Sequence, residues 1–207
     1  MDSDRNRLNW RTPVIHAILV CLGSILILFP AWLPSTTKKG VDLENSAVEL
    51  LQVVLLLFSM ALLLAASIHA KGLKPIYQAL ALGCLAACIG ESPWVDDITR
   101  IDEKWFLAAI FITFGILIFR NTKQALLFIS LSGRHPASGF IASAIILTYI
   151  FAKFFGSHAF WAASLEGEVP ARLPKLCSAY LELLACYFIF VGVVGFTLPL
   201  NKYRASA

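Results

Sequence analysis

The sequence predicts an all-α, polytopic integral membrane bundle of about six transmembrane helices, with both termini in the cytoplasm. The first observation is composition. The 207 residues are 58% hydrophobic and only 14% charged, whereas a soluble domain has about 25% charged residues. The second is the recurrence of apolar runs close to the roughly 20 residues that cross a bilayer. The third is the unequal distribution of Lys and Arg between alternate loops, which predicts the orientation.

The apolar runs account for almost all of the hydrophobic residues, so we expect a single transmembrane domain covering residues 1–207. No separate soluble domain is expected. The predicted spans are approximately residues 14–33, 47–70, 75–91, 102–119, 138–155 and 176–198.

Three of these spans, and one shorter segment, need individual justification. Run 14–33 follows several arginines, as a signal peptide would, but it is longer than the apolar core of a signal peptide, which is about 7–15 residues. We therefore expect a retained span. The apolar cores of 75–91 and 102–119 are short, and the alternative is a tilted or re-entrant pair. Segment 124–132 is too short to span and is predicted to lie at the membrane interface.

The charges predict which side faces the cytoplasm. With six spans, the side holding both termini carries 10 Lys or Arg residues and two acids, a net charge of +8. The opposite side carries seven basic residues and 11 acids, a net charge of −4, and the two values sum to the formal +4 of the chain. Because Lys and Arg mark the cytoplasmic side, we expect both termini in the cytoplasm. The protein would be a multi-pass protein of a cell membrane, such as a bacterial inner membrane. The acidic side would then be periplasmic.

Six polar side chains gather at the predicted outer ends of the spans. They come from segments that are distant in sequence, so a bundle would place them at a similar membrane depth. An acid within a membrane span is a candidate functional residue by default. The predicted site comprises Glu49, Gln52, Glu91, Asp96, His158 and Glu182.

Glu182 is the most informative of these residues, because it lies about two turns inside the last predicted span. An ionised acid at mid-bilayer costs about 2.5–3.5 kcal/mol on insertion scales. Ser178 lies one helical turn before Glu182 and Cys186 one turn after it. Glu49 and Gln52 are three residues apart and share a helix face. That face continues through Leu56 and Ser59, so a partly polar stripe should point into the bundle.

Each residue also has a purely structural interpretation. Ser46 and Glu49 have the spacing of a capping box, and an acid there interacts favourably with the helix dipole. Glu91 could end a span at the interface, and Asp96 could lie in a solvated loop. His158 could be an ordinary interfacial histidine. Glu182 could form a structural ion pair, for which the basic residues at the same end are Lys153, Arg172 and Lys175.

The chemistry of the group favours a metal-dependent or acid–base membrane enzyme that acts on a lipid-like substrate. Carboxylates and an imidazole bind divalent metal ions or act as general acids and bases. The predicted catalytic residues are Glu182, Glu49 and His158. The predicted ligands of a divalent metal ion are Glu49, Glu91, Asp96, His158 and Glu182, with Gln52 as a further polar residue. The sequence contains no HExxH or HxxxH spacing.

Two other functions stay open. A non-catalytic subunit or assembly factor of a membrane complex needs no site, and its partners would be other membrane proteins. An ion-coupled transporter needs a polar stripe that continues to the cytoplasmic side, but spans 47–70 and 176–198 become apolar below their outer turns. Membrane lipid is an expected partner in every case. Because the chain has no phosphate-binding loop and no additional basic patch, no nucleic-acid partner is expected.

Other notable residues have mainly structural interpretations. The five cysteines lie in or at the ends of apolar runs, and none forms a CxxC motif, so we interpret them as packing residues. His16 and His69 lie near the inner ends of adjacent spans, where a haem with two histidine ligands is conceivable. Ala79, Gly83 and Ala87 are spaced four residues apart and should allow close helix packing or, alternatively, the docking of a subunit.

Overall fold

The computed structural model describes residues 18–19, 21–23, 25, 40–70, 72–90, 103–133, 135–165, 170 and 172–197. Every regular element in this part of the chain is helical, as the sequence predicts. The chain divides into two compact units, Met1–Glu44 and Asn45–Ala207. The second unit contains the packed helices described below. The predicted site residues Glu91 and Asp96 and the histidine His16 lie outside the described residues.

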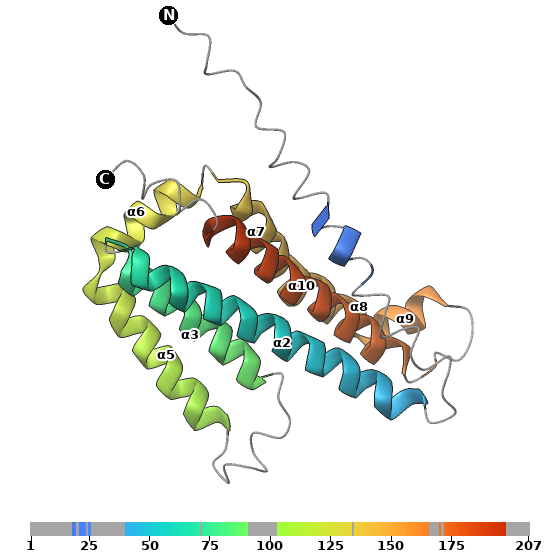
Figure 1. Cartoon of the computed structure of the whole chain (residues 1–207). Coiled ribbons are helices and arrows are strands. Elements are labelled where there is room, and N and C mark those ends of the chain that lie inside the picture. Colours follow the sequence, from blue (N-terminus) through green and yellow to red (C-terminus); the bar gives the residue numbers. More distant parts are fainter. Residues whose placement is uncertain are drawn as a thin grey trace, which may run out of the picture. The chain divides into compact units, whose positions relative to one another are not determined.

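Figure 1 shows the helices in their order along the chain. Between Ala137 and Phe155 three helical segments are continuous, and the middle one, η2, is a π-helix. In chain order the elements are α2 (Gly40–His69), α3 (Lys74–Gly90), α5 (Glu103–Arg120), α6 (Thr122–Ser132), α7 (Ala137–Ile146), η2 (Leu147–Ala152), α8 (Lys153–Phe155), α9 (His158–Ser164) and α10 (Leu173–Thr197).

Three helical stretches are long and apolar enough to cross a membrane: Ala47–His69, Ala137–Phe155 and Leu173–Thr197. A fourth candidate is the pair α5 and α6, bent by 90° as a broken span or a re-entrant loop would be. α3 is apolar but has only 17 residues, about 26 Å at 1.5 Å per residue. Counted over the described residues, the chain therefore has three or four candidate spans, which indicates a membrane protein.

The bend between α5 and α6 has a local cause at Asn121. This residue leaves the helical region of backbone conformation, with φ −123° and ψ 36°. Its side-chain Nδ2 donates to the carbonyl of Leu117 at 2.8 Å, and Thr122 Oγ1 donates to the carbonyl of Phe119 at 2.8 Å. Side chains thus satisfy carbonyls at the end of α5 that would otherwise lack partners. The short segment predicted at 124–132 is accordingly a separate helix.

The core of the second unit joins α2, α3 and α10. One buried cluster contains Leu63 and Ala66 from α2, Tyr77 and Cys84 from α3, and Val193 from α10. α5 packs beside α3, and α7 packs beside α10 (Figure 1). The outer surfaces of the helices carry many large apolar side chains.

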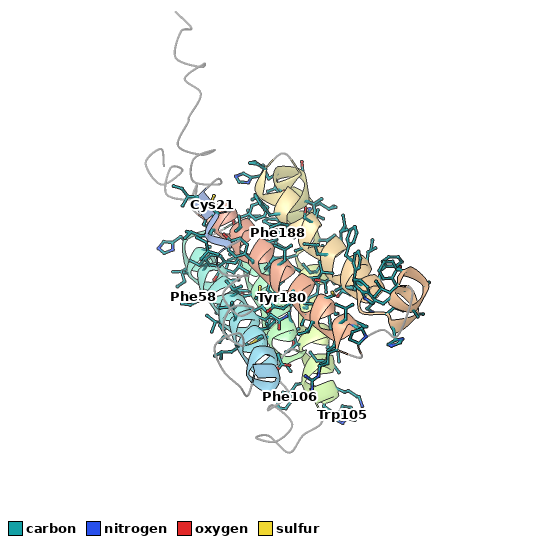
Figure 2. All side chains as sticks on the ribbon, turned by 90° about the vertical axis from the view of Figure 1, so that its right-hand side faces the viewer. Cys21, Phe58, Trp105, Phe106, Tyr180 and Phe188 are labelled. Carbon is teal, nitrogen blue, oxygen red and sulfur yellow. The ribbon has the colours of Figure 1, made fainter. Side chains whose placement is uncertain are left out.

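These outward side chains lie on several helices. Phe58 on α2 is 61% exposed, Trp105 on α5 is 73% exposed and Phe119 is 85% exposed. Figure 2 shows Trp105 near the start of α5, directed away from the neighbouring helices. A soluble monomer rarely exposes so much apolar surface. Exposed apolar surface of this extent is typical of a membrane protein.

Candidate functional site

Gln52 is a buried amide that connects two helices. Its side chain is 1% exposed, and its Nε2 donates to the backbone carbonyl of Ala179 on α10 at 3.3 Å. A carbonyl oxygen within a helix can accept this second hydrogen bond because it has two lone pairs. Gln52 therefore links α2 to α10 within one turn of Glu182.

The predicted stripe on α2 does face the interior. Gln52, Leu56 and Ser59 are all buried, as expected for residues spaced four and three apart on one helix face. Ser59 Oγ donates to the carbonyl of Leu55 at 2.8 Å, within its own helix. Within the stripe, therefore, the Gln52 amide is the polar group that bonds to a neighbouring helix. Glu49, one turn earlier, is half-buried.

Glu182 lies in the wall of a small cavity. Its Oε1 accepts a hydrogen bond from Ser178 Oγ at 3.0 Å, as the four-residue spacing predicts. The cavity has a volume of about 140 Å³. Its other walls come from α2, α3, α7, η2 and α10, and include Leu56, Ala87, Thr148 and Cys186. The carboxyl group thus borders a space in which a ligand group can approach it.

The π-helix η2 contributes to this cavity. Thr148 and Tyr149 both line it, from the second and third residues of η2. π-helical turns are rare and occur frequently at functional sites. The sequence around η2 contains no Pro or Gly to indicate the irregularity, so sequence analysis missed it.

Gly156 brings the chain close to the Ser178–Glu182 pair. A Cβ atom at Gly156 would lie 2.8 Å from the carbonyl oxygen of Ala152 and 3.1 Å from the Cβ of Ser178. Both distances are too short for an ordinary contact. Glycine at this position therefore allows the turn after α8 to pack against α10 beside Ser178.

A larger cavity adjoins the one at Glu182. It has a volume of about 380 Å³ and is lined by side chains of α2, α3, α6, α7 and α10, almost all of them apolar. Ligand pockets typically have volumes of about 300–1,000 Å³. The two cavities share four lining residues: Leu56, Ala87, Ile145 and Ile189. They therefore form neighbouring parts of one space, with Glu182 at one end.

The small-residue stripe on α3 accounts for part of this space. Ala79 is fully buried, at 0% exposure, as expected of a packing residue. Gly83 and Ala87 instead are exposed and line the large cavity. We expected all three residues to pack closely against a neighbouring helix. Of the three, only Ala79 is buried.

The structure describes four of the six predicted site residues: Glu49, Gln52, His158 and Glu182. Gln52 and Glu182 lie on contacting helices, whereas His158 is an exposed residue at the start of α9. Among the described residues, no group of three His, Cys, Asp or Glu side chains is placed to hold a metal ion. Because Glu91 and Asp96 lie outside those residues, the full metal-ligand set stays a prediction.

Glu182 and Gln52 stay predicted site residues, and sequence analysis did not predict the cavity, η2 or the close contact at Gly156. The small residues at 83 and 87 were the one available indication of open space, and they were interpreted as packing residues. Comparison with known proteins found no matching protein family, curated protein or solved structure.

Proposed function

We propose that this chain is a six-span protein of the cell membrane that binds a lipid-like substrate and performs acid–base chemistry on it at Glu182. The observation that carries the proposal is the position of Glu182 at the end of a largely apolar space. A lipid-like molecule has the matching distribution of polarity. Its hydrocarbon tail would occupy the larger cavity, and its polar head would lie beside the carboxyl group.

The surroundings of Glu182 suit proton transfer. A carboxyl group that borders a cavity can exchange a proton with a bound head group as a general acid or base. The Ser178 hydroxyl, 3.0 Å from Oε1, restricts the orientation of the carboxyl group. Thr148 and Cys186 provide a hydroxyl and a thiol on the same cavity. In this proposal Gln52 positions α10 and does not touch the substrate.

The proposed topology has both termini in the cytoplasm and the Glu182 end of the bundle facing outward, into the periplasm of a bacterial cell. The charge difference between the two sides, +8 against −4, supports this orientation. The three or four candidate spans, the shorter α3 and the apolar run 14–33 supply the helices.

The remaining predicted residues are a possible extension of this site. Glu49, Glu91, Asp96 and His158 would add ligands for a divalent metal ion at the same end of the bundle. Oxygen and imidazole ligands suit such an ion. The acid–base proposal requires only Glu182 and is tested without them.

The described structure gives less support to an ion-coupled carrier. Such a protein needs polar groups that continue across the bundle. Among the residues of α2 from Ala47 onward, the buried polar side chains besides Gln52 are Ser59 and Ser67, and both donate to carbonyls of their own helix. The cavity that α2 lines with Leu56 and Leu63 is apolar, which favours a hydrocarbon over an ion.

Lipid analysis of cells that express the wild type or Glu182→Gln tests the proposal. Glutamine keeps the size of the side chain and removes its acid–base function. We expect a lipid species whose amount changes when the wild type is expressed and does not change with Glu182→Gln. Lys123→Gln is the control, because it removes an exposed charge in α6 at a residue that lines neither cavity.

Equal amounts of membrane-inserted protein must be confirmed for each variant. If wild-type expression changes no lipid, or Glu182→Gln changes the same lipid as fully as the wild type, the proposed chemistry is wrong. The non-catalytic subunit would then be the better interpretation.

A further inference from the structure

The large cavity has the chemical character of a hydrocarbon-binding site. Its wall includes Leu56 and Leu63 from α2, Leu80 from α3, and Ile189 and Val193 from α10. A site with such a lining favours apolar ligands. Because the cavity lies among candidate membrane spans, the hydrocarbon tail of a lipid is the apolar group with ready access to it.

Aromatic rings form the end of the cavity that lies away from Glu182. Tyr77, Phe128 and Phe196 all line it. The Tyr77 and Phe128 ring centroids are 6.0 Å apart, and those of Phe128 and Phe196 are 5.8 Å apart. From Glu182 to Phe196 α10 rises about 21 Å, at 1.5 Å per residue. A tail that extends from the Glu182 end therefore meets a boundary after a finite length.

Gly83 leaves space in the wall of this cavity. A Cβ atom built at Gly83 would have no neighbouring atom within 4 Å. By contrast, a Cβ atom at Gly192 on α10 would lie 2.5 Å from Ile141 Cδ1. Gly192 is thus required for close helix packing, whereas Gly83 is not. Since glycine weakens a helix interior, its contribution at position 83 is the open volume that it leaves.

From this geometry we infer that the cavity measures the length of the substrate's hydrocarbon tail and that Gly83 determines the longest tail it accepts. This inference rests on the proposed lipid-like substrate and names its tail-binding site. A larger side chain at position 83 would occupy cavity volume without displacing a neighbouring helix. The longest tails would then lose contacts, and shorter tails would bind as before.

The test uses the full chain in detergent and a series of saturated fatty alcohols of increasing length, measured by competition with a fluorescent fatty alcohol. A neutral head group avoids repulsion by the Glu182 carboxylate. In the wild type, affinity should rise with each added methylene and then reach a plateau. In Gly83→Leu the plateau should begin at shorter chains. Each excluded methylene should weaken binding about fourfold, so losing two or three weakens the longest alcohols about 15- to 60-fold.

Gly115→Leu is the matched control. Gly115 lies in α5, and a Cβ atom there also has no neighbour within 4 Å, but the residue does not line the cavity. This variant should bind the series as the wild type does. A second variant, Phe128→Leu, shortens the side chain at the aromatic end and should move the plateau to longer chains.

An identical binding series for Gly83→Leu and the wild type would overturn the inference. If that result came with a changed oligomeric state in native mass spectrometry, the α3 face would instead bind a second copy of the chain. Glu182→Gln should affect all chain lengths equally, because it alters only the head-group end. If Glu182→Gln leaves binding of the alcohols unchanged while Gly83→Leu moves the plateau, the proposed role of Glu182 fails and the tail-binding site stands.

Discussion

The Gln52 amide gives α2 a specific position against α10. Its hydrogen bond to Ala179 joins residues 127 positions apart, close to the carboxyl group of Glu182. Hydrogen bonds between membrane helices contribute about 0.6 kcal/mol on average and at most about 1.7 kcal/mol. The value of this bond therefore lies mainly in positioning, since α2 and α10 both line the two cavities.

We predict that Gln52→Leu lowers the free energy of unfolding by about 0.6–1.7 kcal/mol, because the interhelical hydrogen bond is lost while the volume is largely kept. Thermal unfolding of the detergent-solubilised protein measures the change. Gln78→Leu, on α3 and half-buried, is the control and should change stability less. Equal losses in the two variants would contradict a specific role for the Gln52 amide.

Gly156 permits the close contact between the turn after α8 and Ser178. We predict that Gly156→Ala is destabilising by about 1–3 kcal/mol, the usual cost of overpacking, because its Cβ would lie 2.8 Å from the Ala152 carbonyl oxygen. Gly139→Ala in α7, where a Cβ meets no atom within 4 Å, should instead be neutral or stabilising. Thermal unfolding of both variants tests this contrast, and an equally mild effect at Gly156 would refute it.

Among the helices, the contact of α7 with α10 is the closest one that glycine makes possible. At Gly192 an added Cβ would meet Ile141, and at Gly195 it would lie 2.8 Å from the Cβ of Ala137. Small residues allow membrane helices to pack in this way. Both helices also line the large cavity.

We predict that Gly192→Leu destabilises the bundle by about 1–3 kcal/mol or more, because the new side chain must push α7 away from α10. Gly83→Leu should destabilise much less, because its side chain enters open space. Unfolding in detergent, measured for both variants at the same protein-to-detergent ratio, provides the comparison. A larger loss for Gly83→Leu would show that the packing of α3 is tighter than described.

The sequence predicted most of the elements because apolar length determines a span. Predicted spans 47–70, 138–155 and 176–198 correspond to Ala47–His69, Ala137–Phe155 and Leu173–Thr197. The π-helix η2 was not predictable, since its sequence LTYIFA contains no Pro or Gly and its geometry depends on packing. In the site, the Ser178–Glu182 bond follows from helical spacing. The Gln52 hydrogen bond could not be predicted from spacing, because its acceptor is a backbone carbonyl on a helix that is distant in sequence.

Over the whole molecule, the described surface and interior are both largely apolar. Side chains such as Phe58 and Phe119 point outward, and the large cavity offers a second apolar environment inside the bundle. The account therefore requires a membrane orientation and a lipid in the cavity, and the two requirements are tested separately.

The orientation predicts that residues 91–104 face the outside of the cell. In a cysteine-free background, Ser92→Cys should react with a membrane-impermeant thiol reagent added to intact cells. Thr122→Cys, at the start of α6 on the proposed cytoplasmic side, should react only after the cells are lysed. The reverse pattern would show that the topology is inverted.

The central claim is that a hydrocarbon tail occupies the cavity next to Glu182, and photolabelling tests it most directly. Membranes containing the full chain would be exposed to a fatty alcohol with a diazirine near the end of its tail, irradiated and analysed by peptide mass spectrometry. The account predicts labels at the aromatic end of the cavity, on residues such as Tyr77, Phe128 and Phe196, reduced by an excess of unlabelled alcohol. Labels confined to outward residues such as Phe58, Ile112 and Phe119, and insensitive to competition, would contradict it.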